Sequence, residues 1–460
     1  MIEKTVNLQT LTQLFVPAAS PLMPPLLHMT SIRSDHRKVS RFANAFFAGL
    51  AVVLLSGCKL AEVFSLSGPQ STMVTAGPVA KSQWDLFMVT VYVTTFIFVV
   101  VGGVLAYAQI KFRAKTDEEA NAAPPPQGHG NPLVEIGLIA ASVGLLVIIA
   151  IPTLRGIWYT HDVPEDEKGS AMDIVATGYQ WWFKFEYPSE MVKLPNGAGE
   201  APLVTGNELV VPANVPIRVQ LRTVDVIHSF WIPKLAGKVD MIPNRANFLW
   251  FKADKPGYYY GQCAEYCGDS HAIMRFRVIA LSPGDYVKWL DNQKESARSV
   301  TADSQASAEA PRAQFASLKL DGRPALSGSP EFDANPLEAW RRMQEPEPGE
   351  KAADIAAGRK LFQQKTCISC HTVRGHEGIG VTGPDLTRVG ARSTIAAGVL
   401  ENTREHMHEW IKNPNHFKPG NKMWFGGYNT LEGDEWKPNP NLALNDHEID
   451  LLVDYLHSLK

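Results

Sequence analysis

The sequence predicts a multidomain membrane protein: a two-helix transmembrane hairpin, then an all-β barrel, then an all-α domain at the C-terminal end. Three observations predict this order. Two long apolar runs lie within the first 160 residues, apolar and polar residues alternate after residue 170, and a C-x-x-C-H motif lies between two helical patterns near the end. A length of 460 residues agrees with two or three domains of about 150 residues each.

The composition excludes several classes of protein. The net charge is −3, 45% of residues are apolar and 20% are charged. This balance excludes a collagen, a disulfide scaffold and a wholly disordered chain, and it provides no basic field to attract nucleic acid. The five cysteines, at positions 58, 263, 267, 367 and 370, each lie in a local pattern with its own chemistry.

The first apolar run resembles a secretory signal. Phe42–Leu55 follows a basic segment and ends in L-S-G-C, which is similar to a bacterial lipoprotein box with Cys58 as the lipidated residue. We therefore expect an N-terminal extension and signal peptide over residues 1–57 and a periplasmic tether over 58–83. A first membrane helix with an incidental cysteine is the alternative. The start of translation is either Met1 or Met29.

Two further runs predict the hairpin, over residues 84–160. Leu86–Ile110 and Leu133–Trp158 are each long enough for a bilayer core of about 30 Å, because a helix rises about 1.5 Å per residue. Basic residues in the short loop between them place that loop in the cytoplasm and both flanks outside. The alternative, a buried helical hairpin of a soluble protein, does not need runs of this length. Glu135, just inside the second span, is either an interfacial side chain or a functional carboxylate.

Short alternating segments broken by Pro and Gly fill residues 171–282 and predict an antiparallel sandwich or barrel. Within it, C-A-E-Y-C-G-D-S-H-A-I-M begins at Cys263, and a further histidine lies upstream. Two thiolates, two imidazoles and a thioether form a soft ligand set that suits copper better than zinc. The candidate ligands are His228, Cys263, Cys267, His271 and Met274. A disulfide between the two cysteines is the alternative in an oxidising compartment.

The last two predicted parts are a flexible linker over 283–350 and a helical domain over 351–460. The linker lacks periodicity and is rich in Ala, Ser, Pro and Glu. In the helical domain, Cys367-Ile368-Ser369-Cys370-His371 has the pattern of covalent haem attachment, in which the thiols add to the vinyl groups and the imidazole ligates the iron. A helix precedes this motif, and a second helix, opened by Asn445 and Glu448 as in a capping box, ends the chain.

These motifs together resemble subunit II of the haem–copper oxidase superfamily, followed by a class I cytochrome c domain. The resemblance implies a cupredoxin-like barrel that holds the dinuclear copper centre CuA through the five side chains above and the backbone carbonyl of Glu265. The Glu265 carboxylate would also reach a magnesium ion shared with subunit I. Trp181 matches the tryptophan that receives electrons, and Glu135 matches the glutamate at the cytoplasmic mouth of a proton path. Tyr179 and Phe183 depart from the family pattern, which weakens the expectation of a shared docking surface.

For the C-terminal domain, the resemblance implies that the first and last helices cross. It also implies that the carbonyl of Pro384 orients the ring of His371 and that a methionine is the sixth iron ligand. Met423 follows a segment like the family's ligand loop, whereas Met407 lies in a helical pattern and is interpreted as structural. Other histidines of this domain, including His376, are expected at the surface.

The function that the resemblance implies is electron transfer within a terminal cytochrome c oxidase, a proton-translocating oxidoreductase whose oxygen chemistry occurs in subunit I. Electrons would pass from a donor, such as cytochrome c or a cytochrome bc complex, through haem c and CuA. The expected partners are subunit I, other oxidase subunits and the bacterial inner membrane, crossed twice with the copper and haem domains on the periplasmic side. Cutting the linker is expected to lower turnover at low donor concentration, because a tether makes the donor step intramolecular.

Two other functions stay open. The chain could be the electron-accepting subunit of a CuA-type nitric oxide reductase, or a copper-handling membrane lipoprotein, although metal storage needs no haem relay. A quinol oxidase subunit would lack the copper ligands.

Overall fold

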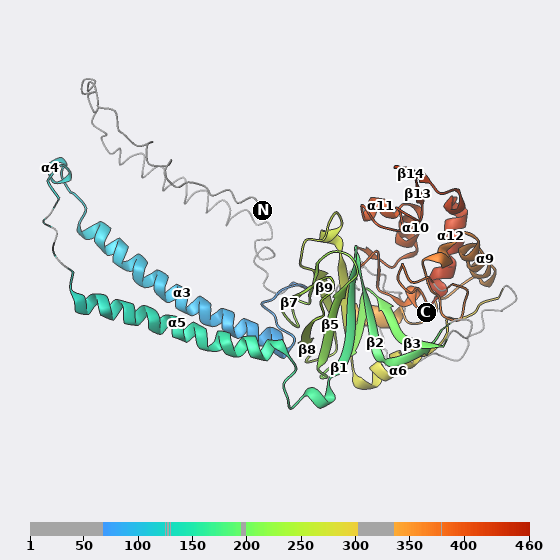
Figure 1. Ribbon diagram of the computed structural model, residues 1–460, viewed down its shortest axis with the longest axis horizontal. Coiled ribbons are helices and arrows are strands. Elements are labelled where there is room, and N and C mark those ends of the chain that lie inside the picture. The colour runs from blue at the N-terminus through green and yellow to red at the C-terminus, as the bar shows by residue number, and fades with distance from the viewer. Residues whose placement is uncertain are drawn as a thin grey trace, which may run out of the picture. The chain divides into compact units, whose positions relative to one another are not determined.

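The structure, a computed structural model, describes residues 68–460 except 125, 127, 129, 195–198, 302–334 and 379. It contains two long helices, a β domain (residues 171–294) and a C-terminal domain (352–460), in the order that the sequence predicts (Figure 1). The signal segment over 1–57 and Cys58 lie outside the described residues.

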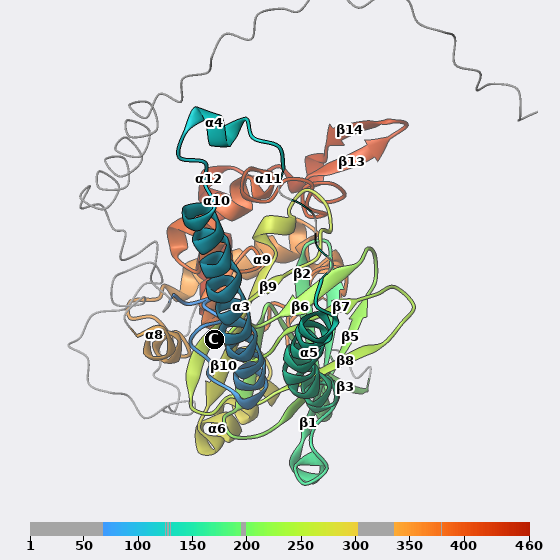
Figure 2. The same cartoon turned by 90° about the vertical axis from the view of Figure 1, so that its left-hand side faces the viewer.

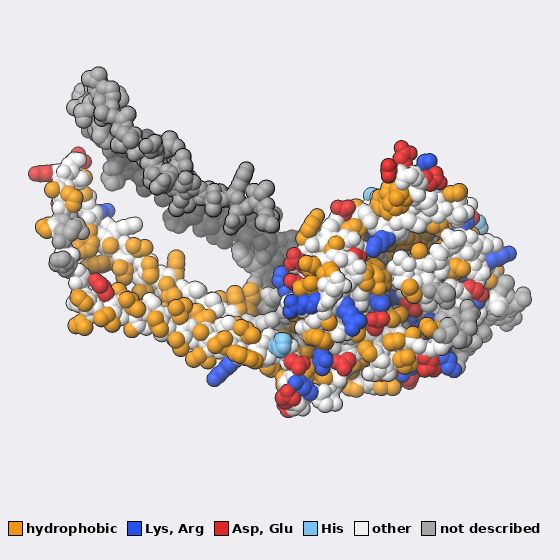
Figure 3. Space-filling model, viewed as in Figure 1, with side chains coloured by type: hydrophobic (Ala, Val, Ile, Leu, Met, Phe, Trp, Pro, Cys, Tyr) orange, Lys and Arg blue, Asp and Glu red, His pale blue; other side chains and the backbone are white. Residues whose placement is uncertain are grey.

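The two long helices, α3 (Pro78–Lys111) and α5 (Pro132–His161), contain the two predicted spans and contact each other. They have 34 and 30 residues and are apolar enough to cross a membrane. Their apolar side chains are mostly exposed, as the orange surface of Figure 3 shows, and no described residue of α5 is buried. A helix that is apolar all round and not covered by protein suits a lipid environment. The loop between them carries the short helix α4 (Asp117–Ala120).

The β domain is a sandwich of two five-stranded sheets. The first sheet has the order β3-β2-β1-β5-β8 and consists of β1 (Met172–Tyr179), β2 (Trp182–Lys193), β3 (Glu200–Gly206), β5 (Ile217–Thr223) and β8 (Asn247–Phe251). The second has the order β4-β10-β9-β6-β7 and consists of β4 (Glu208–Pro212), β6 (His228–Trp231), β7 (Lys238–Met241), β9 (Gly257–Cys263) and β10 (Arg275–Leu281). A 3₁₀ turn, η1 (Lys168–Ser170), precedes β1.

The prediction of a purely antiparallel domain is wrong for two strand pairs. β1 pairs with β5, and β4 with β10, in parallel. The reason is a crossover: after β3 the chain adds β4 to the second sheet and returns as β5 to the first. The predicted alternation does hold in β5, where Ile217, Val219 and Leu221 are fully buried. In β10, by contrast, Arg277 is also buried, because residues of the C-terminal domain cover it.

The prediction of a flexible linker over 283–350 is wrong at both ends. Pro283–Lys294 forms helix α6, whose Tyr286, Trp289 and Leu290 join the core of the β domain. Pro336–Arg342 forms helix α8, whose Trp340 is 1% exposed and joins the same core. The region as a whole has few aromatic residues, and their wide spacing gave no periodic pattern. These residues supply the apolar area that a folded helix must bury. Residues 302–334 lie outside the description.

The C-terminal domain contains the helices α9 (Ala352–Gln364), α10 (Arg404–Lys412), α11 (Pro414–Phe417) and α12 (Asp446–Ser458). As expected, α9 and α12 cross. They touch so closely at Gly358 that a Cβ there would lie 1.9 Å from the carbonyl oxygen of Leu451. The predicted capping box of Asn445 and Glu448 is present.

Shorter elements complete this domain (Figure 2). They are the 3₁₀ turns η4 (Cys367–Ser369), η5 (Val389–Ala391) and η6 (Pro440–Leu442), and two small hairpins, β11 (Thr394–Ile395) with β12 (Leu400–Glu401) and β13 (Asn429–Glu432) with β14 (Glu435–Pro438). The sequence analysis did not anticipate the hairpins.

Candidate metal centre and haem-attachment site

The five candidate copper ligands lie together where β9 ends and β10 begins. Cys263 is the last residue of β9, and the loop that follows carries Cys267, the turn η3 (His271–Ile273) and Met274. His228 opens β6, which pairs with β9. Strand pairing therefore brings the distant histidine to the loop, where it is fully buried.

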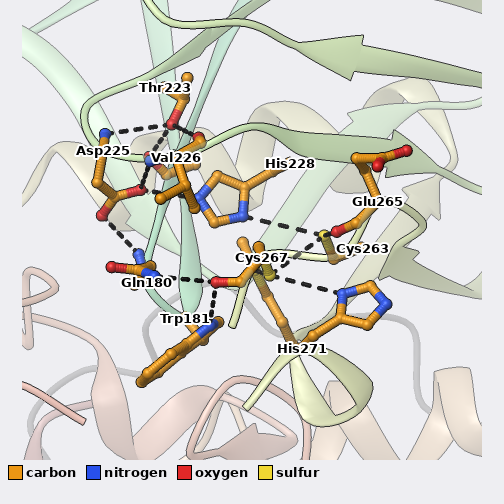
Figure 4. Close-up of polar contacts among 12 residues, drawn as sticks. Gln180, Trp181, Thr223, Asp225, Val226, His228, Cys263, Glu265, Cys267 and His271 are labelled. Atoms are coloured by element: carbon orange, nitrogen blue, oxygen red, sulfur yellow. Dashed lines mark hydrogen bonds and ion pairs between the residues drawn. The ribbon is translucent and has the colours of Figure 1, made fainter. Parts of the chain in front are cut away.

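The distances between these side chains suit metal ligation (Figure 4). The sulfur atoms of Cys263 and Cys267 are 3.8 Å apart, and both cysteines are free. His228 Nδ1 lies 3.9 Å from Cys263 Sγ, and His271 Nδ1 lies 3.5 Å from Cys267 Sγ. Met274 Sδ lies 3.9 Å from Cys267 Sγ. Two sulfur atoms that each lie about 2.3 Å from one tetrahedral ion are about 3.8 Å apart, so the donor set fits a bound metal.

The hydrogen bond between the two thiols shifts their pKa values in opposite directions. The hydrogen bond from Cys267 lowers the pKa of Cys263, with a further contribution from His228. The same hydrogen bond, together with burial, raises the pKa of Cys267. The pair therefore favours one thiolate over two, and an added positive charge would favour the second. A metal cation supplies such a charge, because coordination deprotonates a thiol.

Asp225 orients His228 and was missed by the sequence analysis. Its Oδ1 lies 2.9 Å from His228 Nε2, so that Nδ1 faces Cys263. Burial alone would raise the pKa of Asp225, but the hydrogen bond with His228 and the backbone N–H of Gln180 lower it to about 2. A carboxylate behind a ligating histidine fixes its tautomer and ring direction. The D-x-x-H spacing in the sequence could have indicated that this carboxylate lies next to the histidine.

Two other residues singled out from the sequence lie beside the sulfur atoms. The backbone carbonyl oxygen of Glu265 is 3.2 Å from Cys263 Sγ, while its carboxylate points away from the two sulfurs (Figure 4). Trp181 is buried, and its Nε1 donates to the carbonyl oxygen of Cys267 at 2.9 Å. Gly420 of the C-terminal domain packs on the opposite side of this indole, where a Cβ would lie 2.9 Å from Trp181 Cη2.

The haem-attachment motif begins on η4 (Cys367–Ser369), and Cys370 and His371 follow this turn. Cys367, Cys370 and His371 are each half-buried. His371 Nδ1 lies 2.9 Å from the carbonyl oxygen of Pro384, as expected, and this bond leaves Nε2 available for iron. Burial lowers the pKa of His371, which favours the neutral imidazole that a metal requires. Burial also raises the pKa of Cys367 to about 12, so this group stays a thiol.

Four other residues were given a role or a position from the sequence, and the structure locates each of them. Met407 is 2% exposed and belongs to the core of the C-terminal domain, in agreement with a structural role. Met423 is half-buried in the segment after α11, and its role as iron ligand stays a prediction. Glu135 lies in the first turn of α5 and is exposed, and its role also stays a prediction. The surface position expected for His376 is wrong: it is buried against Tyr455.

Two family models match consecutive parts of the chain. Cytochrome c oxidase subunit II, periplasmic domain, matches residues 172–281, and cytochrome c matches residues 355–460. These families imply a dinuclear copper centre and a haem c, and the donor sets described above fit both groups.

The chain is also similar to individual proteins of known name or structure. Cytochrome c oxidase subunit 2 of Alkalihalophilus pseudofirmus is 30% identical over 426 residues, which cover 92% of this chain and 98% of the relative. Quinol oxidase subunit 2 of Bacillus cereus is 30% identical over 253 residues, which cover 55% of this chain and 80% of the relative. The crystal structure of the periplasmic domain of subunit II of the Bradyrhizobium japonicum cytochrome oxidase is 39% identical, with a TM-score of 0.23, and covers 27% of this chain and 93% of that chain.

Proposed function

The chain belongs to the cytochrome c oxidase subunit 2 family, and we propose that it receives electrons from a cytochrome c or a cytochrome bc complex. It is an electron-transfer subunit of a haem–copper oxidase, with subunit I and other oxidase subunits as partners. When bound, haem c and CuA supply the one-electron redox chemistry that carries electrons from the donor to subunit I, where oxygen is reduced to water.

One observation carries the proposal: the copper loop and the candidate haem-ligand loop meet at Trp181. Gly420, three residues before Met423, packs on the indole from one side. On the other side, the indole donates its hydrogen bond to the carbonyl of Cys267. Next to it, Ser270 Oγ donates to the carbonyl oxygen of Pro419 at 2.7 Å. Trp181 thus connects the two ligand segments by direct contact, and we assign it the transfer of electrons between them.

The copper-site residues have distinct roles in this proposal. The side chains of His228, Cys263, Cys267, His271 and Met274 would hold the two copper ions, together with the carbonyl of Glu265. The burial of His228, Cys263, Cys267 and Met274 excludes water from these four ligands. The carboxylate of Glu265 points away from the sulfurs and is the group that would bind magnesium at the contact with subunit I.

In the haem site, Cys367 and Cys370 would form the thioether bonds, His371 and Met423 would ligate the iron, and the carbonyl of Pro384 orients the ring of His371. Support comes from the hydrogen bond between His371 and Pro384 and from the neutral state that burial gives to the imidazole.

The membrane arrangement completes the proposal. The helices α3 and α5 cross the bacterial inner membrane, and the basic loop after α3 faces the cytoplasm. The β domain and the C-terminal domain then lie on the periplasmic side. Glu135, at the loop end of α5, lies on the side from which protons are taken up, and we assign it a role in passing protons towards subunit I.

The test is a parallel measurement of oxygen uptake and nitric oxide consumption. The complex is isolated in mild detergent through a C-terminal tag and supplied with an artificial reductant. We expect rapid oxygen uptake that His228→Ala abolishes, because this change removes a buried metal ligand. The matched control is His447→Ala, which alters an exposed histidine outside both sites and leaves uptake unchanged. Nitric oxide consumption without oxygen uptake would assign the chain to the reductase branch, and absence of both activities would contradict the proposed partner.

A further inference from the structure

The β domain and the C-terminal domain share buried polar contacts. The first group surrounds Glu208 of β4, which is 5% exposed. Its carboxylate accepts hydrogen bonds from Trp340 Nε1 at 3.0 Å and from the backbone N–H of Ser393 at 2.7 Å. Ser393 Oγ also bonds to this carboxylate and lies 2.8 Å from the hydroxyl of Tyr258. Separation of the domains would leave a buried carboxylate with fewer donors, which is costly.

The second group is a row of three backbone carbonyls on the C-terminal domain. Ala396, Ala397 and Gly398 have φ values of 53°, 59° and 76°, all in the left-handed region. The carbonyl of Ala397 accepts from the backbone N–H of Arg275 at 3.0 Å, and that of Gly398 accepts from Arg277 Nη2 at 3.2 Å. Two alanines in a conformation that disfavours a Cβ persist only where surrounding contacts hold them. Here the contacts to Ala397 and Gly398 belong to the other domain.

Lys418 links this row to the copper loop. Its ammonium group donates to the carbonyl of Ala396 at 3.2 Å and to the carbonyl of Ile273, beside the candidate ligand Met274, at 3.3 Å. Lys418 is 4% exposed, so this contact between the domains is buried.

The third group caps the C-terminal end of α6 with two arginines of the C-terminal domain. Arg374 Nη1 donates to the carbonyl oxygens of Lys294 and Glu295 at 3.4 and 3.3 Å, and Arg388 Nη2 donates to that of Glu295 at 3.1 Å. Both arginines are buried, with 4% of each residue exposed. The last carbonyls of a helix lack partners within the helix and carry partial negative charge, so buried guanidinium groups are favourable there.

We propose that these contacts form an interdomain latch, made of Glu208, Ser393, Arg374, Arg388 and Ala396–Gly398, that holds the C-terminal domain in a fixed position over Trp181. The haem relay is then a docked unit, and the covalent connection through residues 302–334 is not needed to keep it in place. Both flanks of that segment are anchored: Ala297 N–H donates to the carbonyl of Arg374 at 2.7 Å, and Trp340 is buried against the β domain. This inference deepens the proposed function, and it replaces the expectation that cutting the linker lowers turnover.

The latch also determines which surface a donor can use. Trp181 is 7% exposed, because Gly420 and its neighbours cover it. A soluble donor protein therefore reaches the copper site only through the haem of the C-terminal domain.

The test is cleavage of the assembled complex at a protease site inserted between residues 302 and 334. After cleavage and washing in mild detergent, we measure retention of the 335–460 fragment by haem staining, and oxygen uptake. The latch predicts that the fragment stays bound and that uptake changes by less than about twofold. A domain held only by its tether has an effective concentration in the millimolar range, so its release into a micromolar solution would lower the encounter rate about a thousandfold. Loss of the fragment on washing would overturn the proposal.

Variants of the latch provide the second comparison. In Glu208→Gln the amide keeps one acceptor oxygen but faces the remaining donors with its own N–H groups. In Arg374→Gln, α6 loses one cap. We expect both variants to retain the domain before cleavage and to release a large share of the fragment after cleavage. The matched control, Arg404→Gln, changes an arginine that pairs with Asp454 inside the C-terminal domain and should behave like the unaltered chain.

Retention of the fragment by both latch variants would also contradict the assignment. Unchanged copper and haem absorption spectra show that both domains fold in each variant. If the uncleaved complex took up no oxygen, the proposed function would fail, whereas fragment retention would still test the latch.

Discussion

The copper site and the haem-attachment site hold their histidines by different means. At the copper site, His228 is held by a side chain, because Asp225 Oδ1 lies 2.9 Å from its Nε2. At the haem site, His371 is held by a backbone group, the carbonyl of Pro384, also at 2.9 Å. The first support is an ionisable carboxylate with its own hydrogen-bond partners, whereas the second is set by the path of the chain.

A closely packed glycine, by contrast, is common to the two imidazoles. Gly383, next to Pro384, lies so close to the ring of His371 that a Cβ would be 2.5 Å from its Cε1. The contact between Gly178 and His228 is looser by a small margin, with a Cβ distance of 2.7 Å. The haem site is therefore controlled by shape, while the copper site adds a chemical control that one substitution can remove. Each domain should therefore respond to a different kind of change.

The largest effect is expected from Gly383→Ala in the haem site. The added methyl group would push the His371 ring away from the carbonyl of Pro384, and overpacking of this kind costs about 3 kcal/mol at the upper end of its usual range. We expect a loss of the low-spin haem spectrum, measured by visible absorption, with the copper signal unchanged. Gly169→Ala is the matched control, because no atom lies within 4 Å of its Cβ position. A normal haem spectrum in the Gly383 variant would show that shape does not control this site.

Asp225→Asn tests the chemical control of the copper site. The amide keeps the size of the side chain but removes its charge and offers an N–H to His228, so the ring loses its fixed tautomer. Loss of such a support lowers metal affinity about 10- to 100-fold, or roughly 2 kcal/mol. Copper retention against a competing chelator measures the effect, with the haem spectrum as internal reference. Asp173→Asn, which alters an exposed carboxylate near Arg218, is the control. Equal copper retention in both variants would remove the distinction between the two sites.

The features that could be predicted from the sequence are those formed by residues close together in the chain. The residues of the loop from Cys263 to Met274, and those of the C-x-x-C-H motif, are close in the chain, so their spacing alone brings them together. The two apolar spans and the capping box of α12 are likewise local patterns. These features, together with the order of the domains, were accessible from residue type and periodicity.

What could not be predicted depends on contacts between distant segments. Trp340 and Glu208 are 132 positions apart, and nothing in the composition around α8 indicates that they meet. The parallel pairing of β1 with β5 follows from a crossover between sheets that alternation does not encode. His376 resembles any polar residue in a loop, yet α12 covers it through Tyr455. In each case tertiary packing, rather than local preference, decides the outcome.

The smallest effect is a pH dependence confined to the C-terminal domain. Burial, with the charge of Arg359, lowers the pKa of His376 from 6.5 to about 4, so the folded domain favours the neutral ring. Its contribution to stability is therefore complete above about pH 6.5 and is lost as the pH falls towards 4, because the unfolded chain binds the proton first. Between pH 6.5 and 5.5 this loss amounts to about 1 kcal/mol.

Guanidinium unfolding of the complex, followed by haem absorption at several pH values, measures this slope. We expect His376→Gln to flatten it, whereas His416→Gln, which changes an exposed histidine, should leave it unchanged. Unfolding of the β domain is followed by its copper absorption. Its dependence on pH should be the same in both variants, because His376 is buried in the C-terminal domain. If the slope persisted in the His376 variant, another buried group would have to carry it, and the acid sensitivity could not be assigned to this ring.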